Sequence, residues 1–399
     1  MKPAAAGALV ALFVVACGPD TTGGVASSPR TSSRPPTTSQ TTVSAAPASM
    51  STKLYCDSHI GATALAIYQF GLTPPFVEML DVSNPLKPAL VCRLTPAYGA
   101  HFLSDTKLAF WVDDQLGTAD LGSGAITQTA RLAGRAGTGA FSSDGSKFAY
   151  RVFDESGAMS THLYVNGSDR TLYTQEPLGG HGGPIGGPLD QLEFSADGSE
   201  LLDFYEFRPM SGPAKFLVYR TSDSFLAFQS SSAGGGVWSR TETALYFSVW
   251  NPQPPAPSGE LDSLDAAGRQ QTVARFPNAI AWPRLTPDGA GIIYDTYDGG
   301  GQPHIWRFDL ATHTATQLSE ATGSIPVFVN PNVIWFDEEQ PCRCGPGGSS
   351  APDGVTLSHD MSTGRDATVD TTLIVPGIGG PALPQTSTRY LLDVWLAPF

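Results

Sequence analysis

Short apolar runs alternate with turn sequences along most of this chain. The clearest example is Phe141-Ser-Ser-Asp-Gly-Ser-Lys-Phe-Ala-Tyr150. Its middle predicts a tight turn, because Asp bonds nearby backbone and Gly accepts a positive φ. The run at Phe148–Tyr150 is suited to a buried strand. Two apolar segments around Asp-Gly together predict a β-hairpin.

The same pattern recurs at a regular spacing. Two further copies keep the Asp-Gly pair: Phe194-Ser-Ala-Asp-Gly198 and Leu285-Thr-Pro-Asp-Gly289. Three copies lack the Asp-Gly pair but keep the order of aromatic residue, turn sequence and apolar run. They start at Phe102, Trp238 and Phe328. Successive starts lie 39 to 53 residues apart, a spacing typical of propellers or solenoids.

Each repeat also contains a second predicted hairpin, as at residues 161–173, 215–228 and 304–318. Two hairpins make four strands, which is one propeller blade. Residues 53–94 lack the signature but resemble one more unit. We therefore predict an all-β fold, a single β-propeller of seven four-stranded blades, with six as the alternative. The last apolar run, Arg389–Leu396, is expected to complete the first or last blade and close the ring.

The repeat resembles the WD40-like repeat of TolB-type β-propellers, which is usually written with Pro-Asp-Gly. Only Pro287-Asp288-Gly289 has the full form, whereas Ser143 and Ala196 replace the proline elsewhere. The resemblance runs from about residue 98 onward. It implies a propeller that docks partner peptides at the mouth of its channel, although propellers of this kind serve several functions.

The N-terminal residues predict export. Ala4–Ala16 form an apolar run that is too short to span a bilayer and suits a signal peptide. The following Cys17 gives a sequence that resembles the lipobox of bacterial lipoproteins; the alternative is an ordinary signal peptide with a chance cysteine. We expect a signal peptide at 1–16, lipidated Cys17 with a disordered Ser/Thr/Pro-rich tether at 17–52, and the propeller at 53–399. The protein would be a membrane-anchored lipoprotein at the cell surface or in the periplasm.

The remaining four cysteines predict disulfides in an exported protein. They are Cys56, Cys92, Cys342 and Cys344, and they allow three connectivities. The favoured pairs are Cys56–Cys92 and Cys342–Cys344, and pairing between the two sets remains open. No set of residues has the spacing of a metal site, so we expect neither a metal nor a cofactor.

The net charge of −14 is spread along the chain rather than gathered in blocks. Nucleic-acid binding requires a basic footprint, so a nucleic-acid partner is excluded. Besides the membrane, we expect an envelope protein, peptide or glycan as partner, and a monomeric protein.

Few residues suggest chemistry. No Gly-x-Ser-x-Gly or His-x-x-x-His motif occurs in a fitting context, and no catalytic residue is predicted. Candidate ligand-binding residues are His181, in the Gly-rich loop 179–188, and the pair Asp295 and Asp298. The alternatives are a plain linker for the loop and a solvated hairpin turn for the two aspartates. The tryptophans are interpreted first as core between blades.

Two main functions follow. The first is a non-catalytic binding or scaffold module for a protein, peptide or glycan. The alternative is an enzyme, a lyase or hydrolase of envelope polysaccharide, with its site in the channel. Converging carboxylates, His and Arg with perturbed pKa values would favour the enzyme, and an apolar channel would favour binding. A purely structural envelope protein, with no pocket, is a third possibility.

Overall fold

The computed structural model describes the chain in twelve ranges, and residues 38–399 belong to one compact unit. The described residues are 41–42, 50–56, 63–69, 75–154, 158–175, 191–205, 215–240, 244–251, 258–297, 302–340, 351–370 and 389–396. Within these ranges there are strands and turns but no helix. Accordingly, the same ranges contain no helix long and apolar enough to cross a membrane.

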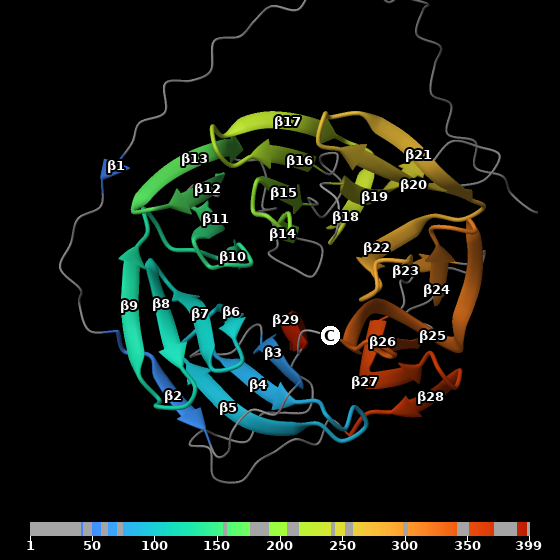
Figure 1. Ribbon diagram of the computed structural model, residues 1–399, viewed down its shortest axis with the longest axis horizontal. Coiled ribbons are helices and arrows are strands. Elements are labelled where there is room, and N and C mark those ends of the chain that lie inside the picture. The colour runs from blue at the N-terminus through green and yellow to red at the C-terminus, as the bar shows by residue number, and fades with distance from the viewer. Residues whose placement is uncertain are drawn as a thin grey trace, which may run out of the picture. The chain divides into compact units, whose positions relative to one another are not determined.

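Seven four-stranded antiparallel blades form a ring, so the protein is a seven-bladed β-propeller (Figure 1). The predicted fold class and the favoured blade count are confirmed. From the centre outward, blade 1 is β29 (Arg389–Leu396), β3 (Thr63–Gln69), β4 (Val77–Asp81) and β5 (Ala89–Thr95). Blade 2 is β6 (Gly99–Ser104), β7 (Lys107–Val112), β8 (Gln115–Asp120) and β9 (Ile126–Arg131). Blade 3 is β10 (Thr138–Phe141), β11 (Lys147–Phe153), β12 (Met159–Val165) and β13 (Ser168–Gln175).

The remaining blades follow the same order. Blade 4 is β14 (Gln191–Phe194), β15 (Glu200–Tyr205), β16 (Lys215–Arg220) and β17 (Phe225–Ser230). Blade 5 is β18 (Ala233–Trp238), β19 (Ala244–Asn251), β20 (Ser258–Asp265) and β21 (Gln270–Phe276). Blade 6 is β22 (Ile280–Leu285), β23 (Gly291–Tyr297), β24 (Pro303–Asp309) and the first part of β25 (Thr314–Asn330). Blade 7 is the last part of β25 with β26 (Val333–Gln340), β27 (Ala351–Asp360) and β28 (Arg365–Thr368).

The C-terminal strand closes the ring. β29 pairs antiparallel with β3 and becomes the innermost strand of blade 1, so the first blade is built from both ends of the chain. The prediction of a closing strand is confirmed, and it is the first blade that this strand completes. Two short strands add to outer edges: β1 (Thr41–Thr42) pairs with β13, and β2 (Lys53–Cys56) pairs with β5.

The core lies between neighbouring blades. In β11, Phe148, Ala149 and Tyr150 are all buried, although successive side chains of a strand point to opposite faces. Both faces are covered, because blade 3 packs between two other blades. Ala149, for example, belongs to a cluster with Leu201 and Tyr205 of blade 4. This is why the second strand of each repeat reads as a continuous apolar run.

The repeated turn is held by the same bonds in three blades. Ser142 Oγ donates to Asp144 Oδ1 over 2.7 Å, and the Lys147 backbone N–H donates to Ser142 Oγ over 3.0 Å. The equivalent Ser/Thr–Asp pairs are Ser195–Asp197 at 2.8 Å and Thr286–Asp288 at 2.6 Å. The next residue is glycine in each case, with φ between 66° and 71°. The signature is therefore a structural device that joins the first two strands of a blade.

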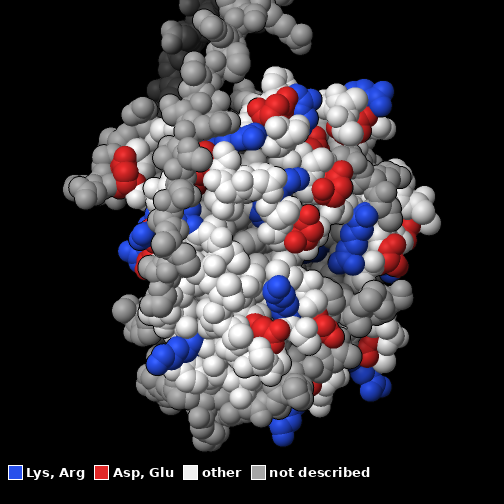
Figure 2. Space-filling model, turned by 60° about the vertical axis from the view of Figure 1, so that its left-hand side comes forward, with Lys and Arg blue, Asp and Glu red and all other residues white. Residues whose placement is uncertain are grey.

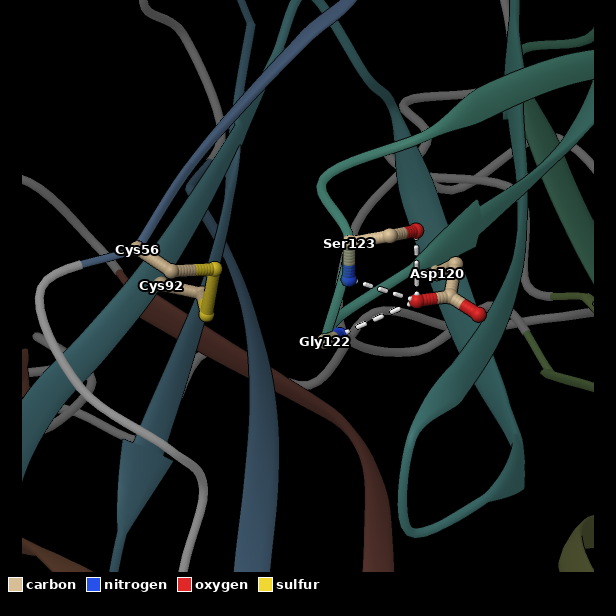
Figure 3. Close-up of a disulfide and its surroundings, with 5 residues drawn as sticks. All are labelled: Cys56, Cys92, Asp120, Gly122 and Ser123. Atoms are coloured by element: carbon tan, nitrogen blue, oxygen red, sulfur yellow. Dashed lines mark hydrogen bonds between the residues drawn. A yellow bond between two sulfur atoms is a disulfide. The ribbon is translucent and has the colours of Figure 1, made fainter.

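One disulfide joins Cys56 of β2 to Cys92 of β5, as predicted (Figure 3). The bond fixes β2 to the outer edge of blade 1. The second predicted pair, Cys342–Cys344, lies outside the described residues, as do Cys17 and the signal peptide. On the face shown in Figure 2, Lys and Arg side chains are interspersed with Asp and Glu, and no patch of one sign dominates.

Candidate ligand-binding site in the central channel

A cavity of about 640 Å³ lies at the centre of the ring. Its lining residues come from the innermost strands of six blades, namely β6, β10, β14, β18, β22 and β25. The lining also includes Ser143, Ala196 and Ser239, which lie one or two residues beyond the innermost strands β10, β14 and β18. The cavity therefore opens at the end of the channel where the repeated turns lie. Its volume is within the range of small-ligand sites, roughly 300–1,000 Å³.

The first apolar residue of the repeat forms much of the cavity wall. Five of the six repeat starts line it: Phe141, Phe194, Trp238, Leu285 and Phe328. Trp111 of β7 adds a further ring, with its centroid 6.1 Å from that of Phe141. Aromatic faces of this kind bind apolar side chains, peptide planes or sugar rings. The interpretation of the tryptophans as core is correct for Trp111 and Trp238, which are buried, but both also line the cavity.

The residue that precedes each repeat start also faces the channel. These six residues are His101, Ala140, Glu193, Val237, Arg284 and Val327, and all of them line the cavity. Three of them are polar or charged. The sequence analysis did not predict Glu193 and Arg284 as site residues. Both directly precede a repeat start, and this shared position in two repeats was a usable signal.

Glu193 and Arg284 bring opposite charges from blades 4 and 6 into one channel. Burial raises the pKa of Glu193 above its ordinary value; the charge of Arg284 and the hydrogen bond from Gln191 act in the other direction and do not cancel this effect. Burial also lowers the pKa of Arg284, against the attraction of Glu193 and Asp295. Both shifts have the same physical cause, which is the loss of water around a charged group. A third charge, Arg240, lines the same cavity and is exposed.

Gln191 fixes the wall between blades 4 and 5. The ladder between β18 and β19 is interrupted between Ala233 and Gly236. Gln191 Nε2 donates to the Gly236 carbonyl over 2.7 Å, and the Gly236 N–H donates to Gln191 Oε1 over 3.1 Å. The side-chain amide thus pairs with the backbone of Gly236, where the β18–β19 ladder resumes after the bulge. Gln191 Nε2 also donates to Glu193 Oε2 over 2.6 Å, which positions that carboxylate.

The strand that carries Arg284 is irregular. The pairing of β22 with β23 shifts between Ala281 and Arg284, and Trp282 has a φ of 50°. A bulky residue in the left-handed region costs about 1–3 kcal/mol and persists only where surrounding structure imposes it. Bulges next to binding sites re-aim side chains, and this one directly precedes Arg284.

His101 belongs to the cavity wall and also connects blades 2 and 3. Its Nε2 lies 3.4 Å from the Ser143 carbonyl, and its ring stacks with Phe141 at 6.3 Å. Ser143 Oγ in turn donates to the Ala196 carbonyl of blade 4 over 3.0 Å. The rim of the cavity is thus tied across three consecutive blades.

The predicted ligand-binding residues do not gather at this site. His181 and Asp298 lie outside the described residues. Asp295 lies within β23, is fully buried and does not line the cavity. The expectation of a solvated turn is wrong at Asp295, because the neighbouring blade elements cover both faces of β23. Among the described residues, no three His, Cys, Asp or Glu side chains lie close enough together to hold a metal ion.

The fold and its cavity define the chain as a β-propeller with a ligand-sized channel site. No protein-family model matches the chain, and no curated protein matches its sequence. The tricorn protease has a similar fold, with a TM-score of 0.49 and 12% identity over 80% of this chain and 35% of that protein. TolB from Acinetobacter baumannii gives a TM-score of 0.40 and 14% identity over 77% of this chain and 79% of TolB. An oligogalacturonate lyase from Vibrio parahaemolyticus gives 0.45 and 11% over 76% and 84% of the two chains. At these identities the likeness concerns the fold alone, and TolB is among the proteins with a similar propeller.

Proposed function

We propose that this protein is a non-catalytic binding module, which takes a segment of a protein, peptide or glycan into its central channel. The observation that supports this most directly is the cavity itself, whose wall combines the aromatic residues Phe141, Trp238 and Phe328 with the charged Glu193 and Arg284. Such a mixture of apolar faces and a few oriented polar groups is typical of ligand sites.

The rigidity of the wall supports recognition. Gln191 holds Glu193 and the bulged backbone of Gly236, and His101 contacts the turn of the next blade. A ligand that enters meets groups that are already positioned, so little conformational entropy is lost on binding.

We further propose that the module works in the cell envelope, attached through lipidated Cys17 and a tether that ends near residue 52. The lipobox-like sequence before Cys17 supports the anchor. The Cys56–Cys92 disulfide supports an oxidising compartment, because such bonds are rare in the cytosol. The acidic net charge of −14 suits an exported protein without a nucleic-acid partner.

The test is capture of the ligand by the full chain from a detergent extract of the native envelope. Ala196 lines the mouth of the cavity and is exposed, so Ala196→Trp narrows the entrance without changing the core. Ala227→Trp is the matched control, because Ala227 is also an exposed alanine of blade 4 but lies on the outer strand β17. We expect a stoichiometric ligand that is bound by the wild type and by Ala227→Trp, and lost in Ala196→Trp. Equal capture by all three proteins would show that the channel is not the site.

One observation favours the alternative, an enzyme that acts on envelope polysaccharide. General acid catalysis uses a carboxyl group with a raised pKa in a site that also holds a cation and a histidine, and Glu193, Arg284 and His101 line one cavity. Incubation of the full chain with envelope polysaccharide decides between the two functions. Shortened chains or new reducing ends, absent with Glu193→Gln, would establish the enzyme. Retention of unchanged polysaccharide would leave the binding module.

A further inference from the structure

The cavity meets the open edges of two strands. Four consecutive residues of β10, 138–141, and four of β14, 191–194, line it. Side chains of a strand alternate between two faces, so an uninterrupted series means that the cavity touches the strand edge. Among the described strands, both are the last in their sheets and have a strand partner on one side alone.

These edges present backbone donors and acceptors to the channel. The Ser142 N–H donates to the Lys147 carbonyl and so points toward the partner strand β11. In an antiparallel ladder the direction alternates, so the N–H and C=O of Phe141 point the other way, toward the channel. The same reasoning applies to blade 4. There the Ser195 N–H donates to the Glu200 carbonyl, so the backbone N–H and C=O of Phe194 point toward the channel. An extended peptide can pair with edges of this kind, as in β-strand addition.

Arg284 offers a positive group at the same site. Its one hydrogen bond among the described residues runs from Nη1 to the adjacent Pro283 carbonyl over 3.4 Å. Within the described part of the chain, no carboxylate lies at ion-pair distance from Arg284, and Glu193 instead accepts from Gln191. A guanidinium has five N–H donors, which leaves most of them for an anionic ligand. Planar carboxylates match that geometry in a bidentate manner.

The apolar wall supplies the third requirement. Phe141, Trp238 and Phe328 surround the same cavity, and Arg240 adds a second positive charge at its wall. A ligand that fits all three features has an extended main chain, an apolar side chain and a carboxylate at one end.

We propose that the channel binds the free C-terminal end of a peptide or protein chain, with its α-carboxylate on Arg284 and its last residues along the edge of β10 or β14. Apolar side chains near that end pack against Phe141, Trp238 and Phe328. This inference rests on the proposed binding function and names its ligand class.

The experiment compares two chemical forms of one probe. A random N-acetylated hexapeptide mixture, prepared with free C-terminal carboxylates and separately as C-terminal amides, is passed over the immobilised full chain, and retained peptides are measured by mass spectrometry. We expect the acids to be retained about tenfold or more over the amides, the range of a charge-assisted hydrogen bond. The preference should be lost in Arg284→Gln, reduced in Arg284→Lys and unchanged in Ala227→Trp. Because the acid and amide forms are compared on the wild type itself, the test does not depend on the folding of a variant.

The outcomes separate this inference from the proposed function. Equal retention of acids and amides, lost in Ala196→Trp, overturns the carboxylate assignment and leaves a peptide-binding channel. Retention of an acidic oligosaccharide in an Arg284-dependent manner, without retention of peptides, overturns the peptide assignment. If neither form of the peptide is retained, while capture from the envelope extract is still lost in Ala196→Trp, the inference is overturned but the binding function is not. Loss of envelope capture as well contradicts both.

Discussion

Arg151 of blade 3 and Asp203 of blade 4 form an ion pair in which neither side chain is exposed. Arg151 Nη2 lies 2.5 Å from Asp203 Oδ1 and also donates to the Phe204 carbonyl over 2.8 Å. Asp203 Oδ2 accepts from Thr161 Oγ1 over 2.7 Å. Two adjacent blades are thus joined by a buried ion pair, next to the strand that carries Glu193.

Removal of one partner should be costly. Asp203→Ala removes this carboxylate from a buried Arg151, and we expect a loss of about 3–5 kcal/mol in the free energy of unfolding. The double variant Arg151→Met/Asp203→Leu should be closer to the wild type than Asp203→Ala alone, because it buries no charge. Urea unfolding measures both. A single variant as stable as the wild type would show that the pair does not hold the two blades together.

The signature glycines should tolerate no side chain without strain. Gly289 has a φ of 71°, and no atom lies within 4 Å of an added Cβ, so Gly289→Ala tests backbone conformation alone. We expect a loss of about 1–2 kcal/mol in the free energy of unfolding, the cost of a left-handed L-residue. The control is Gly122→Ala, which has ordinary backbone and a nearest contact at 3.6 Å. Equal stability of the two variants would contradict the role of the turn.

The disulfide should stabilise the closing blade. Cys56 and Cys92 are 36 residues apart, and closure of a loop of that size in the unfolded chain is worth roughly 3–4 kcal/mol. The variant Cys56→Ser/Cys92→Ser should therefore unfold at a lower urea concentration than the oxidised protein. The wild type under reducing conditions should match the variant. If reduction leaves the unfolding curve unchanged, the bond does not contribute.

Acid should weaken the repeated turns. The Ser142 hydroxyl, followed by the Ser146 backbone N–H, lowers the pKa of Asp144 to about 2. The pKa values of Asp197 and Asp288 are lowered by bonds of the same kind, chiefly from the Ser199 backbone N–H and the Thr286 hydroxyl respectively. Because the folded pKa lies below that of an unfolded aspartate, about 3.9, the stabilisation is complete above about pH 4 and is lost as the pH falls toward 2.

Replacement of these three aspartates by asparagine should remove that part of the pH dependence while the turn bonds remain. The measurement is the urea midpoint between pH 6 and pH 2. We expect the triple variant to have a shallower acid decline than the wild type. Parallel curves would assign the decline to other carboxylates.

The anchor is tested at Cys17. Cys17→Ser removes the thiol that would receive the lipid, so we expect the protein to leave the membrane fraction and its mass to show no diacylglycerol. The control is Cys56→Ser, which changes a cysteine of the propeller and should leave fractionation unchanged. Unaltered processing and fractionation in Cys17→Ser would contradict the lipoprotein assignment.

The fold was predictable from the sequence because the blades share one short pattern of apolar runs and turn residues. The Ser/Thr-x-Asp-Gly turn is stabilised by hydrogen bonds between residues that are close in sequence. The hydrogen bond between Ser142 and Asp144 therefore has equivalents in the two other copies, at Ser195–Asp197 and Thr286–Asp288. Asp295 shows the limit of such local reading. A series with Asp, Tyr and Gly is typical of a turn, yet Asp295 is buried because other blade elements cover β23.

The sequence by itself determined the all-β repeat and favoured seven blades, a closing strand and the Cys56–Cys92 pair, since all of these follow from local pattern and spacing. Only the tertiary structure decided the site. Glu193 and Arg284 belong to different blades, and each looks like an ordinary polar residue at the end of a strand. Closure of the ring brings the innermost strands around one cavity, and burial there shifts the pKa of both groups.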